Sequence, residues 1–149
     1  MYSVDFDKNL IRGVNLVDIE LLNPHEKVVE KKKTSLVKFI KSYDHYYIIS
    51  SIVCCHKSML IIDGHHRYFA LKQLGFKKVP VTLIDYLHKS IRSGKLNLIE
   101  KEHIINMGQS NELMEPKSTE HSVYCNKTKK WQPIMLLSSM FKIETKDIL

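Results

Sequence analysis

The chain has 149 residues, of which 44% are hydrophobic and 26% charged, and its net charge is +7. This length predicts one soluble domain, residues 1–149 with a core at about 14–137. The sequence has no run of about 18 apolar residues, which excludes a membrane-spanning helix, and no apolar N-terminal stretch, which excludes a secretory signal. We therefore expect a cytoplasmic protein. The positive charge favours an anionic partner but does not choose between a nucleic acid and a phosphorylated small molecule.

The order of apolar and turn-forming residues predicts a mixture of strands and helices. The predicted strands cover residues 14–22, 46–54, 59–62, 79–86, 121–125 and 132–137. The predicted helices cover residues 26–42, 65–74 and 100–108, and the tail at 138–149 is expected to be a short helix or frayed. This mixture predicts the α+β (mixed α/β) class, with a mixed sheet flanked by helices.

The three cysteines carry no metal or redox signature. Cys54 and Cys55 are adjacent in a predicted strand, where neighbouring side chains point to opposite faces, and Cys125 is far away in the sequence. No C-x-x-C spacing occurs. We expect all three to be small buried hydrophobes in a reducing compartment.

The segment from residue 59 to 75 carries the strongest functional signal. A buried strand ends at Asp63, Gly64 permits a tight turn, and a helix begins with His65, His66 and Arg67. The first-turn amides of a helix lack intrahelical partners and lie at the positive end of its dipole, so they form an anion site. Arg67 would add a planar fork for phosphate oxygens, and Asp63 is suited to hold Mg²⁺.

A plain capped turn is the alternative for the same segment, because Asp is a good helix cap and Asp-Gly is a common turn. Three potentially cationic residues at a helix N-terminus conflict with the dipole, and a bound anion would relieve that conflict. A metal shared by His65 and His66 is disfavoured, because adjacent helical positions diverge by roughly 100°.

Two further clusters of polar residues stand near element boundaries. Glu26, in Asn23-Pro24-His25-Glu26, either stabilises a helix start or acts as a general base. The segment 116–121, Pro-Lys-Ser-Thr-Glu-His, either binds a carboxylate or phosphate or is an ordinary polar turn.

Three blocks, taken in order, resemble the ParB/sulfiredoxin-like superfamily and, within it, the free L-serine kinases. They are P-H-E at 24–26, D-G-H-H-R at 63–67 and P-K-S-T-x-H at 116–121. The resemblance covers about residues 14 to 137 and implies a ParB-like fold. It implies a kinase that transfers a phosphoryl group from ATP or ADP to L-serine with Mg²⁺, giving O-phospho-L-serine for cysteine synthesis.

The resemblance also implies residue roles. Glu26 would be the catalytic base, and Asp63 would assist catalysis and hold Mg²⁺. The phosphates would bind Gly64, His65, His66 and Arg67. The serine or its product would bind Lys117, Ser118, Thr119 and His121. The chain departs from the family pattern at Glu120, where an arginine is common, and no purine-contacting residue can be placed.

Three other functions fit parts of the sequence. A ParB-like DNA- or CTP-binding protein fits the positive charge, but it would need an arginine-rich motif and a helix-turn-helix domain that the segment after Tyr86 does not offer. A sulfiredoxin would need a cysteine where His65 stands. A nucleotide sensor without catalysis stays open, and it would tolerate the loss of Glu26.

Overall fold

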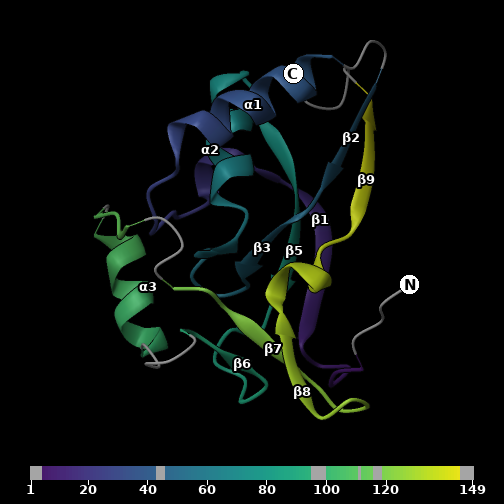
Figure 1. The fold of residues 1–149 in the computed structure, drawn as a ribbon, viewed down its shortest axis with the longest axis vertical. Helices are drawn as coiled ribbons and strands as arrows, with labels where there is room; N and C mark the ends of the chain where they lie inside the picture. The colour runs from purple at the N-terminus through teal and green to yellow at the C-terminus, as the bar shows by residue number, and fades with distance from the viewer. Residues whose placement is uncertain (1–4, 43–45, 95–99, 111, 116–118, 145–149) are drawn as a thin grey trace.

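The computed structural model describes residues 5–42, 46–94, 100–110, 112–115 and 119–144. In this part of the chain, three α-helices are arranged around a four-stranded sheet and two smaller sheets (Figure 1). The predicted α+β class is therefore confirmed. Within these residues no helix has the length and apolar character needed to cross a membrane.

The four-stranded sheet is mixed, as predicted. Its order is β1 (Ile11–Asp18), β5 (Lys78–Ile84), β3 (Ile52–Cys55) and β4 (Ile61–Asp63). Strands β3 and β5 run parallel, whereas β1 and β4 pair antiparallel with their neighbours. The parallel pair is consistent with a connection through a helix, because parallel strands need a crossover.

Strand β3 separates two hydrophobic cores, because its side chains alternate between the two faces of the sheet. Ile52 and Cys54 belong to one core, with residues of α1 (Glu30–Lys41) and α2 (His65–Gln73). Val53 and Cys55 belong to the other core, which includes residues of α3 (Lys101–Gln109). All three cysteines are free and buried, which confirms their prediction as small hydrophobes.

The predicted strand 46–54 is two strands that belong to different sheets. β2 (Tyr46–Ser50) pairs with β9 (Met140–Glu144), whereas β3 pairs with β5. The change of partner occurs at the buried Ser51, whose hydroxyl lies 2.6 Å from the Thr82 hydroxyl and accepts the Ser139 N–H at 2.8 Å. The tail prediction of a helix or frayed end is wrong for residues 140–144, which alternate in burial as an antiparallel strand does.

The third sheet consists of β6 (Ile91–Arg92), β7 (Ser122–Cys125) and β8 (Lys130–Pro133). A strand at 121–125 was predicted, but β6 was not. The predicted strand at 132–137 ends at Pro133 and continues as a 3₁₀ helix over Ile134–Leu137. The buried residues of that helix, Ile134 and Leu137, are three apart, which matches its period.

Helix α1 begins at Glu30, so the helix predicted from residue 26 starts one turn too early. The preceding segment is extended and held on both sides by backbone bridges. Asn23 pairs with Leu60 and Glu26 pairs with Met114, and the Lys27 N–H donates to the Met114 carbonyl at 2.7 Å. Glu26 therefore does not stabilise a helix start, which was the structural alternative for this residue.

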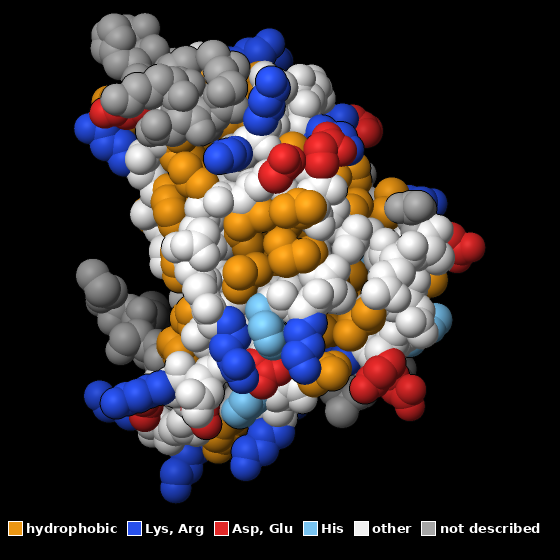
Figure 2. Space-filling view, turned by 180° about the vertical axis from the view of Figure 1, so that it is seen from behind, with side chains coloured by type: hydrophobic (Ala, Val, Ile, Leu, Met, Phe, Trp, Pro, Cys, Tyr) orange, Lys and Arg blue, Asp and Glu red, His pale blue; other side chains and the backbone are white. Residues whose placement is uncertain are grey.

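The surface gives no continuous basic face on the side shown in Figure 2. Lys and Arg side chains are spread among Asp and Glu, and hydrophobic side chains gather near the centre of this face. Packing also extends past the predicted core range of 14–137, because Leu10 and Ile143 are buried in the two cores. The assignment of the whole chain to one domain stays a prediction.

Candidate active site

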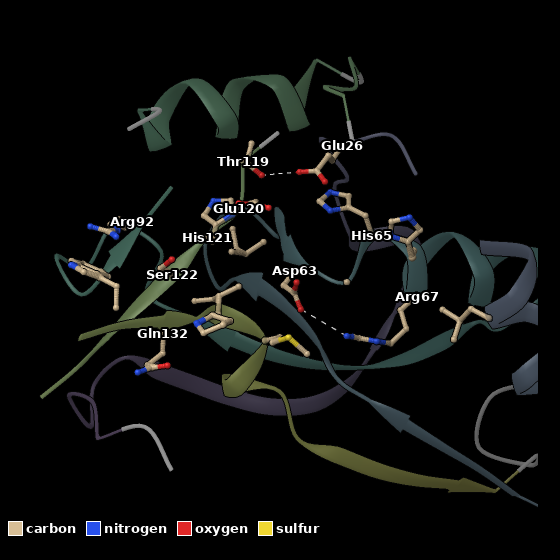
Figure 3. A pocket seen from close by; sticks show the side chains of 18 residues that line it. Glu26, Asp63, His65, Arg67, Arg92, Thr119, Glu120, His121, Ser122 and Gln132 are labelled. Atoms are coloured by element: carbon tan, nitrogen blue, oxygen red, sulfur yellow. Dashed lines mark hydrogen bonds and ion pairs between the residues drawn. The ribbon is translucent and has the colours of Figure 1, made fainter. Parts of the chain in front are cut away.

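One cavity of about 640 Å³ brings together residues from distant parts of the sequence. It lies where β4 passes into α2 and extends toward the β6–β7–β8 sheet (Figure 3). The predicted site residues that line it are Glu26, Asp63, Gly64, His65, His66, Arg67, Thr119 and His121. Lys117 and Ser118 lie outside the described residues. The structure thus places the three sequence blocks around one space.

The junction between β4 and α2 has the backbone that the anion-site hypothesis requires. Gly64 is the cap residue, with φ of 106°, and no side chain caps the helix. A Cβ at this position would lie 3.0 Å from Arg67 Nη1 and 3.4 Å from the Ile52 side chain. The capped-turn alternative required Asp63 as the cap, so it is wrong, and the amide end of α2 adjoins the cavity.

Two of the three potentially cationic residues at this helix end accept hydrogen bonds from the backbone. His65 Nε2 accepts the backbone N–H of His25 at 3.1 Å, and His66 Nε2 accepts that of Val29 at 3.0 Å. A ring nitrogen that accepts a hydrogen bond carries no proton, so both imidazoles are neutral. Burial lowers the pKa of His65 well below its usual value, and the neighbouring histidines act in the same direction.

Arg67 is partly engaged by the protein itself. Its Nη1 donates to the Ser51 carbonyl at 3.1 Å and to the Ser50 carbonyl at 3.4 Å, and its Nη2 lies 3.8 Å from Asp63 Oδ2. Burial raises the pKa of Asp63, and the Arg67 guanidinium opposes that shift. Arg67 therefore ties the start of α2 to the carbonyls of Ser50 and Ser51.

Glu26 is held at the cavity by a chain of hydrogen bonds. The Thr119 hydroxyl, 1% exposed, donates to Glu26 Oε2 at 2.8 Å and lies 3.1 Å from His25 Nε2. Because the hydroxyl hydrogen goes to the carboxylate, His25 Nε2 must donate to the hydroxyl oxygen. This order fixes the direction of one Glu26 oxygen. Thr119 thus serves Glu26 and has no hydroxyl hydrogen left for a substrate.

His121 presents a ring N–H without a protein partner in the described structure. Its Nε2 lies 2.7 Å from the Tyr86 hydroxyl, and its buried Nδ1 has no hydrogen-bond partner there. Donation from Tyr86 to Nε2 leaves fewer buried groups unpaired than the reverse, so Nδ1 carries the hydrogen. Burial lowers the pKa of His121 to about 3, and the ring is neutral at neutral pH. A ligand oxygen in the cavity could accept its N–H.

Comparisons with known proteins bear on the fold and on part of the sequence. No model of a known protein family matches the chain. A solved free serine kinase in complex with AMP superposes with a TM-score of 0.70, covering 99% of this chain and 97% of that chain at 14% identity. This chain has the fold of the free serine kinases. The match at that identity concerns the fold alone.

Two curated proteins resemble part of the chain in sequence. An ATP-dependent L-serine kinase of Staphylothermus marinus is 39% identical over 80 residues, which are 52% of this chain and 31% of that protein. A ParB-like protein of Sulfolobus acidocaldarius is 32% identical over 78 residues, which are 38% of that protein. The resemblance to ParB-like proteins and serine kinases is confirmed, and the matched segment spans about a third of these relatives.

Several residues of this serine kinase fold were missed by sequence reasoning. His25 and Tyr86 support Glu26 and His121 from the buried side. Arg92 and Trp131 line the cavity at the third sheet. His25 stood inside a recognised block, and Trp131 is the chain's one tryptophan, but no local pattern pairs either with a partner so far away in sequence.

We expect stability to fall as the pH falls below about 6.5. Burial lowers the pKa values of His25 (to about 4), His65 and His121 (to about 3), while an unfolded histidine titrates near 6.5. Below pH 6.5 these histidines are protonated in the unfolded chain but not in the folded chain. The free energy of unfolding therefore falls by about 1.4 kcal/mol per pH unit for each histidine. Urea midpoints measured from pH 7.5 to 4.5 test this.

Two variants identify the responsible groups. His121→Gln should make the pH dependence shallower by about one proton, whereas His103→Gln, at an exposed position on α3, should leave the slope unchanged. A wild-type stability that is constant from pH 6.5 to 4.5 would contradict burial of neutral histidines.

Proposed function

We propose that the protein is a free L-serine kinase that transfers the terminal phosphoryl group of ATP or ADP to the serine hydroxyl. The observation that carries this proposal is the presence, around one cavity, of an uncapped helix N-terminus and an oriented carboxylate, Glu26. The first can hold phosphates, and the second can take a hydroxyl proton. The fold and partial sequence match support it.

The donor's phosphates would bind the amide end of α2. Gly64 lets them approach the backbone closely, because it carries no side chain. The Nδ1–H group of neutral His65 is a further donor within this segment, since its Nε2 is an acceptor, and His66 also lines the cavity. Arg67 contributes positive charge and holds the helix end in place.

Asp63 would hold Mg²⁺ together with phosphate oxygens. Mg²⁺ in nucleotide sites is bound by one or two carboxylates, water and phosphate. Asp63 fits this role because it lines the cavity and its side chain is 32% exposed, and the described residues contain no group of three ligands for a metal held by protein alone. The ion would neutralise charge on the phosphate oxygens.

Glu26 would act as the base. Its carboxylate takes the proton of the serine hydroxyl, the serine oxygen forms a bond to the terminal phosphorus, and the bond from that phosphorus to the nucleotide's bridging oxygen breaks. The products are O-phospho-L-serine and the nucleotide shortened by one phosphate. His121 Nδ1–H would bind the serine or product, with Lys117 and Ser118 as further candidates.

This activity would place the protein in the cytoplasm, where phosphoserine supplies cysteine synthesis, and nucleic acid would not be its partner. The direct test is incubation of purified protein with L-serine, Mg²⁺ and either ATP or ADP, followed by mass spectrometry for phosphoserine. Tight nucleotide binding without phosphoserine from either donor would refute the kinase and favour a ParB-like nucleotide-binding regulator.

Thr119→Val should lower kcat about 10- to 100-fold. The substitution keeps the shape of the side chain and removes the hydroxyl that donates to Glu26, and a hydrogen bond to a charged group contributes about 1.5–3 kcal/mol. Thr119→Ser restores the hydroxyl and should recover most activity. The KM for nucleotide should not change, and a fully active valine variant would show that the hydroxyl does not orient the base.

A further inference from the structure

A second arginine lines the cavity at the end away from α2. The guanidinium of Arg92 lies over the ring of Trp131, 4.4 Å from its centroid. Figure 3 shows Arg92, Ser122 and Gln132 on one side of the pocket and Arg67 on the other. Neither Arg92 nor Trp131 has a role in the phosphate and base chemistry described above.

The third sheet holds this arginine in a fixed plane. Arg92 on β6 pairs with Ser122 on β7, and Tyr124 pairs with Trp131 on β8. The rings of Trp131 and Tyr124 also meet edge to face, with centroids 5.3 Å apart. Stacking of a guanidinium on an aromatic face leaves its N–H edge available for in-plane hydrogen bonds.

The guanidinium has no anionic partner among the described residues. Its buried Nε–H donates to no acceptor among the described residues, and no ion pair with Arg92 occurs in this part of the structure. Arg67, in contrast, is engaged by two carbonyls and Asp63. A buried polar group without a partner is costly, and Arg92 is a residue that lines the cavity, so its unpaired donor indicates a ligand.

The backbone places Arg92 beside the third sequence block. The Gly94 N–H donates to the Thr119 carbonyl at 2.7 Å, and Arg92 is opposite Ser122, the residue that follows His121. Arg92 therefore lies on the acceptor side of the cavity, near the residue whose Nδ1–H is unpaired. The amide end of α2, which suits the phosphates, lies at the other side.

We propose that Arg92, stacked on Trp131, binds the carboxylate of the amino-acid substrate. The planar fork of a guanidinium matches a carboxylate with two parallel hydrogen bonds, and the Ser122 hydroxyl is a neighbouring donor. This inference rests on the proposed kinase function. A nucleotide phosphate would satisfy the same guanidinium chemistry, and the experiment separates the two sources.

The test compares Arg92→Gln and Arg92→Lys with wild type, using L-serine and L-serinamide, which lacks the carboxylate. The KM for L-serine should rise about 10- to 100-fold in Arg92→Gln, with partial recovery in Arg92→Lys, because lysine keeps the charge but not the fork. Wild type should prefer serine over serinamide, and Arg92→Gln should lose that preference. The KM for nucleotide should stay within about twofold of the wild-type value, well below the smallest rise of about tenfold expected for the serine KM.

Arg12→Gln is the matched control, because Arg12 pairs with Asp85 at the surface and does not line the cavity. It should behave as wild type. A rise in the nucleotide KM with an unchanged serine KM would assign Arg92 to a phosphate and overturn the carboxylate site. An unchanged serine KM with normal phosphoserine production would refute this inference and leave the kinase intact.

Calorimetry with L-serine alone covers the case in which wild type makes no phosphoserine. Binding by wild type that is lost in Arg92→Gln and unaffected in Arg12→Gln would support the carboxylate site although the kinase proposal had failed. No serine binding by wild type would refute both.

Discussion

Replacing Glu26 with glutamine should reduce kcat for phosphoserine formation about 10²- to 10⁴-fold, the range usual for loss of a general base. Glutamine has the same shape, and its amide oxygen can still accept the Thr119 hydroxyl, but it cannot take a proton from serine. Nucleotide affinity and melting temperature should change little. Single-turnover rates with saturating ATP or ADP isolate the chemical step.

Glu120→Gln is the control for this substitution. Glu120 also lines the cavity, but its side chain is exposed and no hydrogen bond from Thr119 orients it. Its glutamine variant should keep kcat within a fewfold of wild type. Full activity of Glu26→Gln, or an equal loss in both variants, would show that Glu26 is not the base.

Gly64→Ala should abolish tight nucleotide binding and also destabilise the fold. Gly64 has φ of 106°, and the added Cβ would lie 3.0 Å from Arg67 Nη1, at the helix end that we propose as the phosphate site. We expect a dissociation constant for ATP or ADP at least about tenfold higher, equal to 1.4 kcal/mol or more. Fluorescence or calorimetric titration of the variant measures it.

Gly75→Ala separates backbone strain from the binding effect. Gly75 follows the other end of α2 with φ of 85°, and a Cβ there meets nothing within 4 Å. Both substitutions should cost about 1–2 kcal/mol of stability, the usual penalty for a left-handed non-glycine residue. Gly75→Ala should nevertheless bind nucleotide normally. If both variants bind equally well, the α2 end is not the phosphate site.

Local sequence patterns predicted the elements whose signals are local. The turn at Asp63-Gly64 and the helix after it were recognisable, because a strand, a glycine and a helical pattern follow one another within a few residues. The break at Ser51 was not recognisable, because the residues on both sides of it are in strands and only the strand with which they pair changes. Strand β9 depends on its pairing with β2 in the same way.

In the candidate site, too, local features were predicted and long-range contacts were not. The residue types that meet in the cavity were predicted, but the charge state of His65 and His66 was not, because it depends on N–H groups of His25 and Val29 that lie 37 or more residues away. Thr119 was expected to contact substrate, whereas its hydroxyl contacts Glu26 across 93 residues. Long-range burial and hydrogen bonding decide both, and composition does not encode them.

The bridge between Glu26 and Met114 should form late in folding. The β4–α2 junction is formed by neighbours in sequence, but the orientation of Glu26 requires contacts with residues 114 and 119, which close loops of nearly ninety residues or more. Closing such loops carries an entropic cost and slows their formation. A newly synthesised chain should therefore form the β4–α2 turn before Glu26 is oriented, so under the proposed function incompletely folded molecules should bind nucleotide without transferring its phosphate.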